Sequence, residues 1–468
     1  MSEQGVQTGA VALSRFVGAL RFEEIPNAVV ESAKLRVLDI LGICVAASHP
    51  HGGAKVVGEL AKAWGGRKEA HCIGSSLRVP AVSAGLVNGT RAHSLDFDDT
   101  HHASRVHPSC VVVPTALAAA QREEATGKEF LTSTVAGLEV LVRVGLVAPG
   151  RFHERGLHAT SLCGVIGSAA TASRLLGLNF PQTTNALGIS ASMASGLRES
   201  YLGEQATDTK ALHAGWAAHG GILSAELAHE GFTGPATALE GRFGFFHAFV
   251  APDEWDEEVL RHGLGEDWHI PEIVFKLFPC GSLIHASIEA ALILRNRHKI
   301  KPSDIEEIVV VVPPGMVSTV CEPLEQKLRP STGYQAKFSA QFAVAAALRF
   351  GHVTEESFSP QAMTDPSLQE LLARTRYRTD PSMPFPEKYP GGLVVRTRNG
   401  KRFRQMVSNS PGSIERPATE EDIRKKFIRN VEGRIDRRAA EELSDRVMRL
   451  EDESGVNGLL ELCVGPGG

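Results

Sequence analysis

The sequence predicts a mainly α-helical protein with a smaller α+β part, and three observations support this fold class. Apolar residues recur every three or four positions through most of the first 270 residues, as in Val37, Ile40 and Leu41. A β-branched run, EEIVVVVPP from Glu306, comes only after that stretch and reads as a buried strand. Asn399-Gly400 then separates two alternating segments, which is a strong hairpin signal.

Helical patterns occupy most of the first 270 residues and recur in shorter segments after them. Helices are expected over residues 11–63, 80–95, 114–121, 132–147, 185–197 and 210–231. Another is expected to be capped by Thr160 or Ser161 and to pack closely through the small residues Gly164, Gly167, Ser168 and Thr171. Residues 286–297 and 335–350 are helical candidates beside the strands, and residues 419–460 read as charged amphipathic helix. We therefore expect a helical domain of residues 1–270, onto which residues 411–468 fold back, and an α+β domain of residues 271–410.

The amino-acid composition limits the classes of protein to which this chain can belong. The chain has 468 residues, 43% of them hydrophobic and 22% charged, with a net charge of −5, as in a soluble globular protein of two or three domains. No apolar run is long enough for a membrane span, and the N-terminus does not read as a signal peptide, so we expect a cytoplasmic protein with no membrane partner. The basic residues are dispersed, and nucleic-acid binding is not expected. No two of the seven cysteines are closer than 28 positions, which excludes a CxxC pair and indicates reduced, mostly buried thiols.

The stretch from Asn88 to Pro114 is the first candidate for an active site. It holds three aspartates and four histidines. On helical spacing His93, Asp96 and Thr100 fall on one stripe. Pro108 should end that helix and leave His107 on a loop, where catalytic groups are common.

Three further segments place titratable side chains beside Gly or Pro: His158, Lys210 with His213, and Lys276 to His285. A single histidine of this kind is more often structural than catalytic, but the recurrence favours a shared site. Histidines can exchange protons at neutral pH and lysines can hold carboxylates, a combination that suits proton transfer next to a carboxylate. Metal binding is the competing use of an Asp/His cluster. Phosphate-loop, dinucleotide, HExxH and GxSxG motifs are missing from the sequence, which argues against nucleotide cofactors and a hydrolase triad.

Several motifs together resemble the MmgE/PrpD family, which includes 2-methylcitrate dehydratases, cis-aconitate decarboxylases and an iminodisuccinate epimerase. The resemblance covers nearly the whole chain through NGTRAHSLDFDDT with HPS, GLHATSLCGVIGSAA, TKALHAG followed by GILSAELAHEGFTGP, KLFPCGSLIH, and QAKFSAQFAVAAAL. It implies a large helical domain, an inserted lid domain with the site between the two, a homodimer, and no metal or organic cofactor.

The resemblance also implies roles for individual residues. His107, His158, Lys210 and Asp96 would be catalytic, and Thr100, Lys276 and His285 would bind substrate. Two departures from the family's patterns concern the substrate. Gly281 stands where animal-type cis-aconitate decarboxylases place a His, and HPS stands where bacterial 2-methylcitrate dehydratases continue as HPAD.

We therefore expect a cofactor-independent lyase that acts on a small di- or tricarboxylate, with dehydration of a 2-methylcitrate-like hydroxy acid as the leading interpretation. The alternatives are a cis-aconitate-type decarboxylase, and an epimerase or isomerase that abstracts a proton alpha to a carboxylate. A helical dimer that binds a metabolite without turnover is the non-catalytic alternative. The sequence leaves open which acid is the substrate and which histidine is acid or base.

Overall fold

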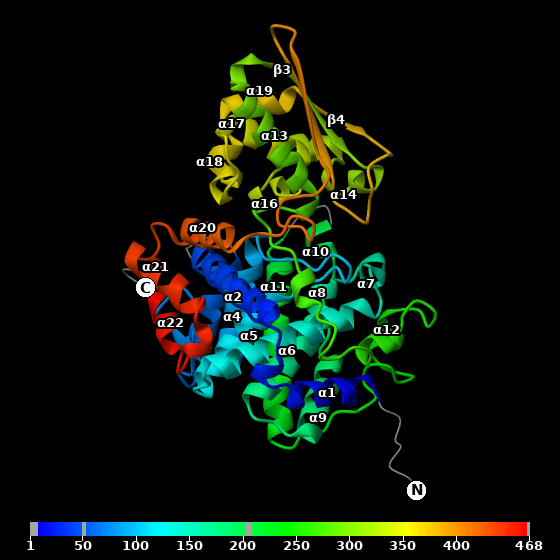
Figure 1. The fold of residues 1–468 in the computed structure, drawn as a ribbon, viewed down its shortest axis with the longest axis vertical. Coiled ribbons are helices and arrows are strands. Elements are labelled where there is room, and N and C mark those ends of the chain that lie inside the picture. Colours follow the sequence, from blue (N-terminus) through cyan, green and yellow to red (C-terminus); the bar gives the residue numbers. More distant parts are fainter. Residues whose placement is uncertain (1–7, 49–52, 203–206, 466–468) are drawn as a thin grey trace. The chain divides into compact units, whose positions relative to one another are not determined.

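The computed structural model describes residues 8–48, 53–202 and 207–465. Its contacts divide the chain into two compact units. The first unit comprises Met1–Ser94, Asp98–Val274 and Thr419–Gly468, and the second comprises Phe275–Ala418 with the short segment Leu95–Phe97. The predicted fold class is confirmed, because helices dominate and the sheets are small (Figure 1). None of the helices in the described part of the chain has the length and apolar character that crossing a bilayer requires.

The first unit is a packed set of helices. Its elements are α1 (Gly9–Ala19), α2 (Asn27–Ala47), α3 (Gly53–Trp64), β1 (Ala70–His71), β2 (Arg78–Val79), α4 (Ala81–Ser94), α5 (Ser109–Arg122), α6 (Gly127–Leu146), α7 (Arg151–Glu154), α8 (Ala159–Leu175), α9 (Phe180–Ser192), α10 (Glu199–Leu202), α11 (Thr209–His229), α12 (Phe245–Phe249), α20 (Glu420–Val431), α21 (Arg437–Val447) and α22 (Asn457–Leu462). The two-residue strands β1 and β2 pair antiparallel, in a region for which only helices were expected.

Helix α11 lies at the centre of this unit, packed against α4 and α8. Small residues make the approach possible: a Cβ on Gly89 of α4 would lie 2.8 Å from the Cα of Gly215 in α11. The predicted small face of α8 also packs closely, since a Cβ on Gly167 would lie 2.6 Å from the Cβ of Leu141 in α6. Close backbone packing of this kind fixes the positions of side chains on the facing helix surfaces.

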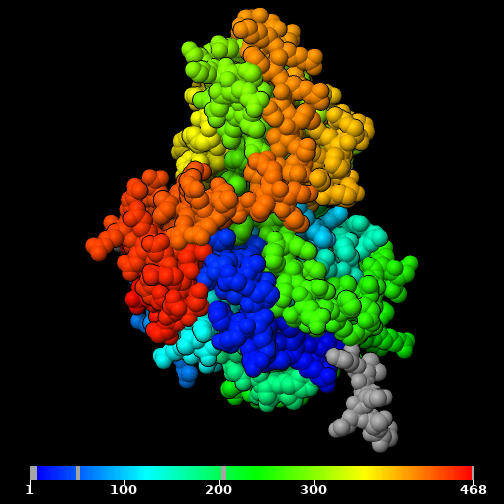
Figure 2. All heavy atoms as spheres, in the orientation of Figure 1, coloured from blue at the N-terminus to red at the C-terminus, as the bar shows by residue number. Residues whose placement is uncertain are grey.

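The C-terminal helices complete the first unit. Helix α20 packs against α2, and Figure 2 shows the red C-terminal residues beside the blue N-terminal ones. The two helices approach closely at Gly42, where a Cβ would lie 2.9 Å from the Phe427 ring. The buried Lys426 ammonium lies 2.7 Å from the buried Asp39 carboxylate at the same joint.

The second unit contains a four-stranded sheet in the order β4-β3-β5-β6. Its elements are α13 (His285–His298), β3 (Ile305–Val312), α14 (Val317–Val320), α15 (Leu324–Leu328), α16 (Gly333–Ala336), α17 (Ala340–Phe350), α18 (Pro360–Met363), α19 (Pro366–Ala373), β4 (Thr375–Thr379), β5 (Gly391–Thr397) and β6 (Arg402–Val407). β3 is parallel to β4 and antiparallel to β5. The predicted hairpin is confirmed, because β5 and β6 pair antiparallel around Gly400, whose φ is +80°.

Candidate active site

The motif DFDDT adopts an irregular loop. Helix α4 ends at Ser94, Asp96 has a left-handed φ of 53°, and Thr100 pairs with Val274 in an isolated bridge. The predicted helical stripe of His93, Asp96 and Thr100 is therefore wrong. Aspartates disfavour helix interiors because their carboxylates bind nearby backbone groups, and three of them within four residues end the helix well before Pro108.

A buried ion pair holds this loop in the first unit. The Arg36 guanidinium lies 2.7 Å from the Asp99 carboxylate, and both side chains are 1% exposed. Arg36 also donates to the carbonyls of Ile270 and Ile273. Asp99 accepts hydrogen bonds from the Ser109 hydroxyl and backbone N–H, so its carboxylate also fixes the start of α5. Asp99 thus has a structural role.

Asp98 contacts two histidines. Its Oδ2 lies 2.8 Å from His93 Nδ1 and 3.4 Å from His107 Nδ1. His107 Nδ1 also lies 2.7 Å from the carbonyl oxygen of Asp99, which can only accept, so Nδ1 carries the proton. Proton exchange by His107 therefore falls on Nε2. The Thr100 hydroxyl, 3.1 Å from the same Nδ1, further orients the ring. Its expected role in substrate binding remains a prediction.

His158 lies at the N-cap of α8, and it is held on two sides. Its backbone N–H donates to the carbonyl of Gly196, and its Nδ1 lies 2.9 Å from Nδ1 of His213 in α11. Thr160 does not cap α8, contrary to the prediction, because its hydroxyl accepts the backbone N–H of His107. Ser161 does not cap it either, since its hydroxyl donates to the carbonyl of His213. Both hydroxyls therefore tie neighbouring parts of the site together.

Imidazole rings from several elements gather around His158. Its ring centroid lies 5.6 Å from His93, 6.3 Å from His107, 5.1 Å from His213 and 6.1 Å from His153. His93 and His158 are stacked with an interplanar angle of 16°. Such a group of imidazoles can take up, hold and release protons within a space comparable to a small carboxylic acid.

Burial favours the neutral form of three of these rings, those of His158, His213 and His153. The pKa of His158 lies well below its usual 6.5, first because of burial and then because of the neighbouring rings and Lys210. Burial also lowers the pKa of His213 to about 4, and that of His153 to about 3. Nε2 of His93 and Nε2 of His153 are buried and have no hydrogen-bond partner within the described ranges. His158, His213 and His153 therefore stay uncharged at physiological pH.

Lys210 supplies positive charge to the same unit. It lies in the first turn of α11, is 3% exposed, and its Nζ lies 5.3 Å from the centre of the Tyr201 ring. Tyr201 in turn contacts His158, with ring centres 5.4 Å apart. The structure thus brings together His107, His158 and Lys210, which the sequence had placed in three separate segments.

The other three expected residues lie in the second unit. Asp96 and Lys276 form a buried ion pair of 3.2 Å, and Lys276 also donates to the Asp96 carbonyl. The structure therefore shows Lys276 bound to a carboxylate of its own chain. His285 is buried at the start of α13, where its Nε2 donates to the carbonyl of Cys280. The expected catalytic role of Asp96 and the expected substrate-binding roles of Lys276 and His285 remain predictions.

Two groups of side chains in the described part of the chain have donor sets that suit a metal ion. One comprises His93, Asp98 and Cys110, and the other His101, His269 and Glu272. In the first, burial raises the pKa of the Cys110 thiol well above its usual range, which favours the protonated thiol. In the second, the backbone N–H of Ser104 donates to Nδ1 of His101, which places the ring proton on Nε2 and directs it to Glu272. Both groups thus already make hydrogen bonds within the protein.

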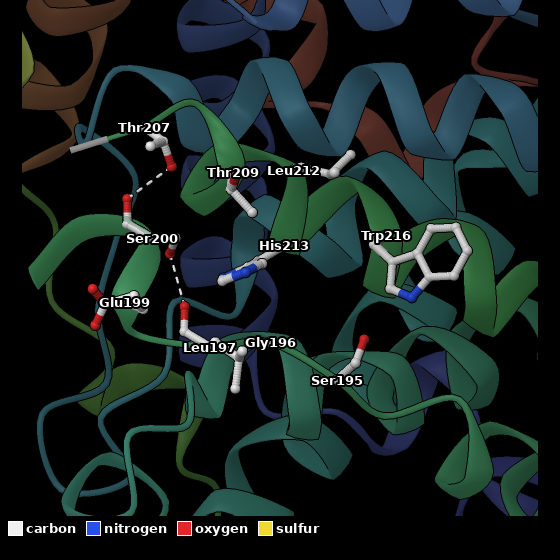
Figure 3. A pocket seen from close by; sticks show the side chains of 10 residues that line it. All are labelled: Ser195, Gly196, Leu197, Glu199, Ser200, Thr207, Thr209, Leu212, His213 and Trp216. Atoms are coloured by element: carbon white, nitrogen blue, oxygen red, sulfur yellow. Dashed lines mark hydrogen bonds between the residues drawn. The ribbon is translucent and has the colours of Figure 1, made fainter. Parts of the chain in front are cut away.

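A cavity of about 810 Å³ opens beside the imidazole cluster. Figure 3 shows His213 at its wall, with Trp216 from the same helix and with residues of the segment that follows α9. The hydroxyl of Thr207 donates to the carbonyl of Ser200, and the hydroxyl of Ser200 donates to the carbonyl of Leu197, so this wall is hydrogen-bonded within itself. The cavity gives small molecules a route to His213.

The sequence matches two family models in succession. The MmgE/PrpD N-terminal domain matches residues 11–258, and the MmgE/PrpD C-terminal domain matches residues 278–452. The chain belongs to the MmgE/PrpD family. The resemblance inferred from the motifs is thereby confirmed.

Curated relatives of this MmgE/PrpD protein match almost end to end. It is 30% identical to the mouse cis-aconitate decarboxylase, over 96% of this chain and 92% of that protein. It is also 30% identical to the human cis-aconitate decarboxylase (96% and 93% covered) and 25% identical to that of Aspergillus terreus (95% and 93%). The protein is an MmgE/PrpD-type lyase. These relatives favour the decarboxylase alternative over the leading interpretation, dehydration of a 2-methylcitrate-like acid.

Sequence reasoning gave no specific role to three residues that the structure places in the site: His93, Asp98 and His213. His93 and Asp98 stand in the motif HSLDFDDT that was singled out, and His213 follows Lys210 by three positions in TKALH. Helical spacing places His213 on the same face as Lys210. That spacing was the available signal for it.

Proposed function

We propose that this protein decarboxylates a small unsaturated polycarboxylate of the cis-aconitate type without help from a cofactor. The observation that supports this most directly is the cluster of His107, His158 and Lys210, in which two imidazoles with distinct environments lie beside a buried ammonium group. The full-length similarity to cis-aconitate decarboxylases agrees with it.

The chemistry requires three things of the protein. Loss of CO₂ breaks the bond between a substrate carbon and a carboxylate carbon and leaves the electron pair on the substrate. A cation stabilises that developing negative charge, and Lys210 can supply it. A proton must then reach the carbanion, and an imidazole can deliver it.

His107 is better suited than His158 to act as the proton donor. Its Nδ1 is occupied by the Asp99 carbonyl and lies near the Asp98 carboxylate, whose negative charge stabilises a protonated ring. His158 is instead surrounded by other imidazoles and by Lys210. We therefore assign His107 as the acid and His158 as a neutral hydrogen-bonding group that contacts the substrate.

Turnover of cis-aconitate tests the proposal. The purified protein, stripped of metal with a chelator, is incubated with cis-aconitate, and CO₂ release and a new alkene product are followed by NMR. His107→Ala should lower kcat by about 10²-fold or more, the usual contribution of a general acid. His229→Ala, at an exposed position in the same unit, is the matched control and should keep full activity.

Other substrates in the same assay separate the remaining alternatives. Turnover of 2-methylcitrate with no CO₂ release would favour the dehydratase. Incorporation of solvent deuterium into recovered substrate without a new alkene would favour an epimerase. Thermal stabilisation by polycarboxylates with no product at all would leave only the metabolite-binding dimer.

A further inference from the structure

The contact between His158 and His213 joins two nitrogens of the same kind. Their Nδ1 atoms are 2.9 Å apart, a hydrogen-bond distance, and both side chains are more than nine-tenths buried. A hydrogen bond between two imidazole nitrogens needs one donor and one acceptor. One ring must therefore carry its proton on Nδ1 and the other on Nε2, so the tautomers of the two rings depend on each other.

Hydrogen bonds and close packing from neighbouring segments hold the two rings in this arrangement. The Gly196 carbonyl accepts the backbone N–H of His158, and Leu157 pairs with Leu197 in an isolated bridge. Gly196 has a φ of 141°, and a Cβ there would lie 2.8 Å from the Ser161 side chain and 3.6 Å from His213 Cε1. The Ser161 hydroxyl also donates to the His213 carbonyl. The segment of Gly196 and Leu197, which lines the cavity, thus also fixes the position of His158.

The geometry points to His213 as a positioning residue that sets the tautomer and ring orientation of His158 and thereby selects Nε2 of His158 as the nitrogen that meets the substrate. His213 occupies the place that a carboxylate or carbonyl takes beside many catalytic histidines. Here the partner is a neutral imidazole, so it orients His158 without forcing it into the charged form. The inference rests on the proposed function only in taking His158 as a group that contacts the substrate.

Two substitutions separate orientation from packing. His213→Asn keeps a hydrogen-bonding atom near the position of Nδ1, whereas His213→Leu keeps volume and removes it. With the decarboxylase assay, we expect His213→Leu to lose about 10²-fold in kcat with a much smaller change in KM, and His213→Asn to recover a large part of it. Equal kcat for wild type and His213→Leu would overturn the inference.

The cavity allows a rescue experiment that a purely structural role would not pass. His213→Ala leaves a ring-sized space that opens into the cavity of about 810 Å³. Added imidazole should restore the kcat of His213→Ala in a saturable way and should leave His107→Ala unrescued. No effect of imidazole on His213→Ala, with the variant folded by circular dichroism, would contradict the inference.

NMR of the wild-type protein tests the same point without turnover. With ¹⁵N-histidine labelling, the signals that disappear in His158→Gln and His213→Asn identify the two rings. We expect one ring in the Nδ1–H tautomer and the other in the Nε2–H tautomer. Two rings in the same tautomer would overturn the inference, whereas opposite tautomers in a protein that does not decarboxylate cis-aconitate would leave it standing and reject the proposed function.

Discussion

At the scale of single residues, the adjacent aspartates Asp98 and Asp99 have different roles. Asp98 contacts the rings of His93 and His107, and Asp99 pairs with Arg36. We expect Asp98→Asn to lower kcat by about 10²-fold, because an amide cannot stabilise the protonated form of His107. Steady-state kinetics on cis-aconitate measure this loss.

Asp99→Ala should instead act on stability. It leaves the buried Arg36 guanidinium without its carboxylate, which costs about 3–5 kcal/mol of unfolding free energy in buried pairs of this kind. Urea unfolding measures this loss, and Asp98→Asn should show a smaller one. A stable Asp99→Ala protein together with a fully active Asp98→Asn protein would contradict this division of roles.

At the scale of elements, the joint between α2 and α20 depends on one buried pair. Burial raises the pKa of Asp39 to about 6 and lowers that of Lys426, so both charges are held against a desolvation cost. We expect Lys426→Met to destabilise the protein by about 3–5 kcal/mol, because it strands the Asp39 carboxylate. The double variant with Asp39→Leu should recover most of that loss, as measured by urea unfolding.

Lys425→Met is the control for this joint. Lys425 is 64% exposed and pairs with Glu421 on the helix surface, where such pairs contribute about 0.5 kcal/mol or less. Equal losses for Lys425→Met and Lys426→Met would show that the buried pair does not hold α20 on α2.

At the level of elements, some helices and the hairpin could be predicted from the sequence, and some helix ends could not. Helices with a steady apolar period and the Asn-Gly hairpin were predictable because one local signal decides each of them. The end of α4 at Ser94 was not, because the period of His93, Asp96 and Thr100 continues past the point where the aspartates take other partners. Helix α5 begins at Ser109 and includes Pro114, where the prediction had it begin.

The sequence predicted which motifs supply residues to the candidate site, but it did not predict which side chains those residues contact. His107, His158 and Lys210 stand in family motifs, and the sequence alone can carry that resemblance. The pairing of His158 with His213 brings together positions 55 residues apart, and the Asp98 contacts depend on the irregular loop. Distances of this kind come from tertiary packing, which single-sequence patterns do not encode.

At the scale of the whole molecule, the buried histidines make stability depend on pH. His213, His153 and His158 have folded pKa values below the ordinary 6.5 of an unfolded chain. Between pH 6.5 and about 4 the unfolded chain therefore binds more protons than the folded one, and stability falls as the pH falls through that window. Each such histidine contributes up to about 1.4 kcal/mol per pH unit.

His153→Gln should make urea-unfolding free energies decline less steeply between pH 6.5 and 4, by about one proton. Parallel slopes for His153→Gln and wild type would mean that His153 is not held neutral by the fold.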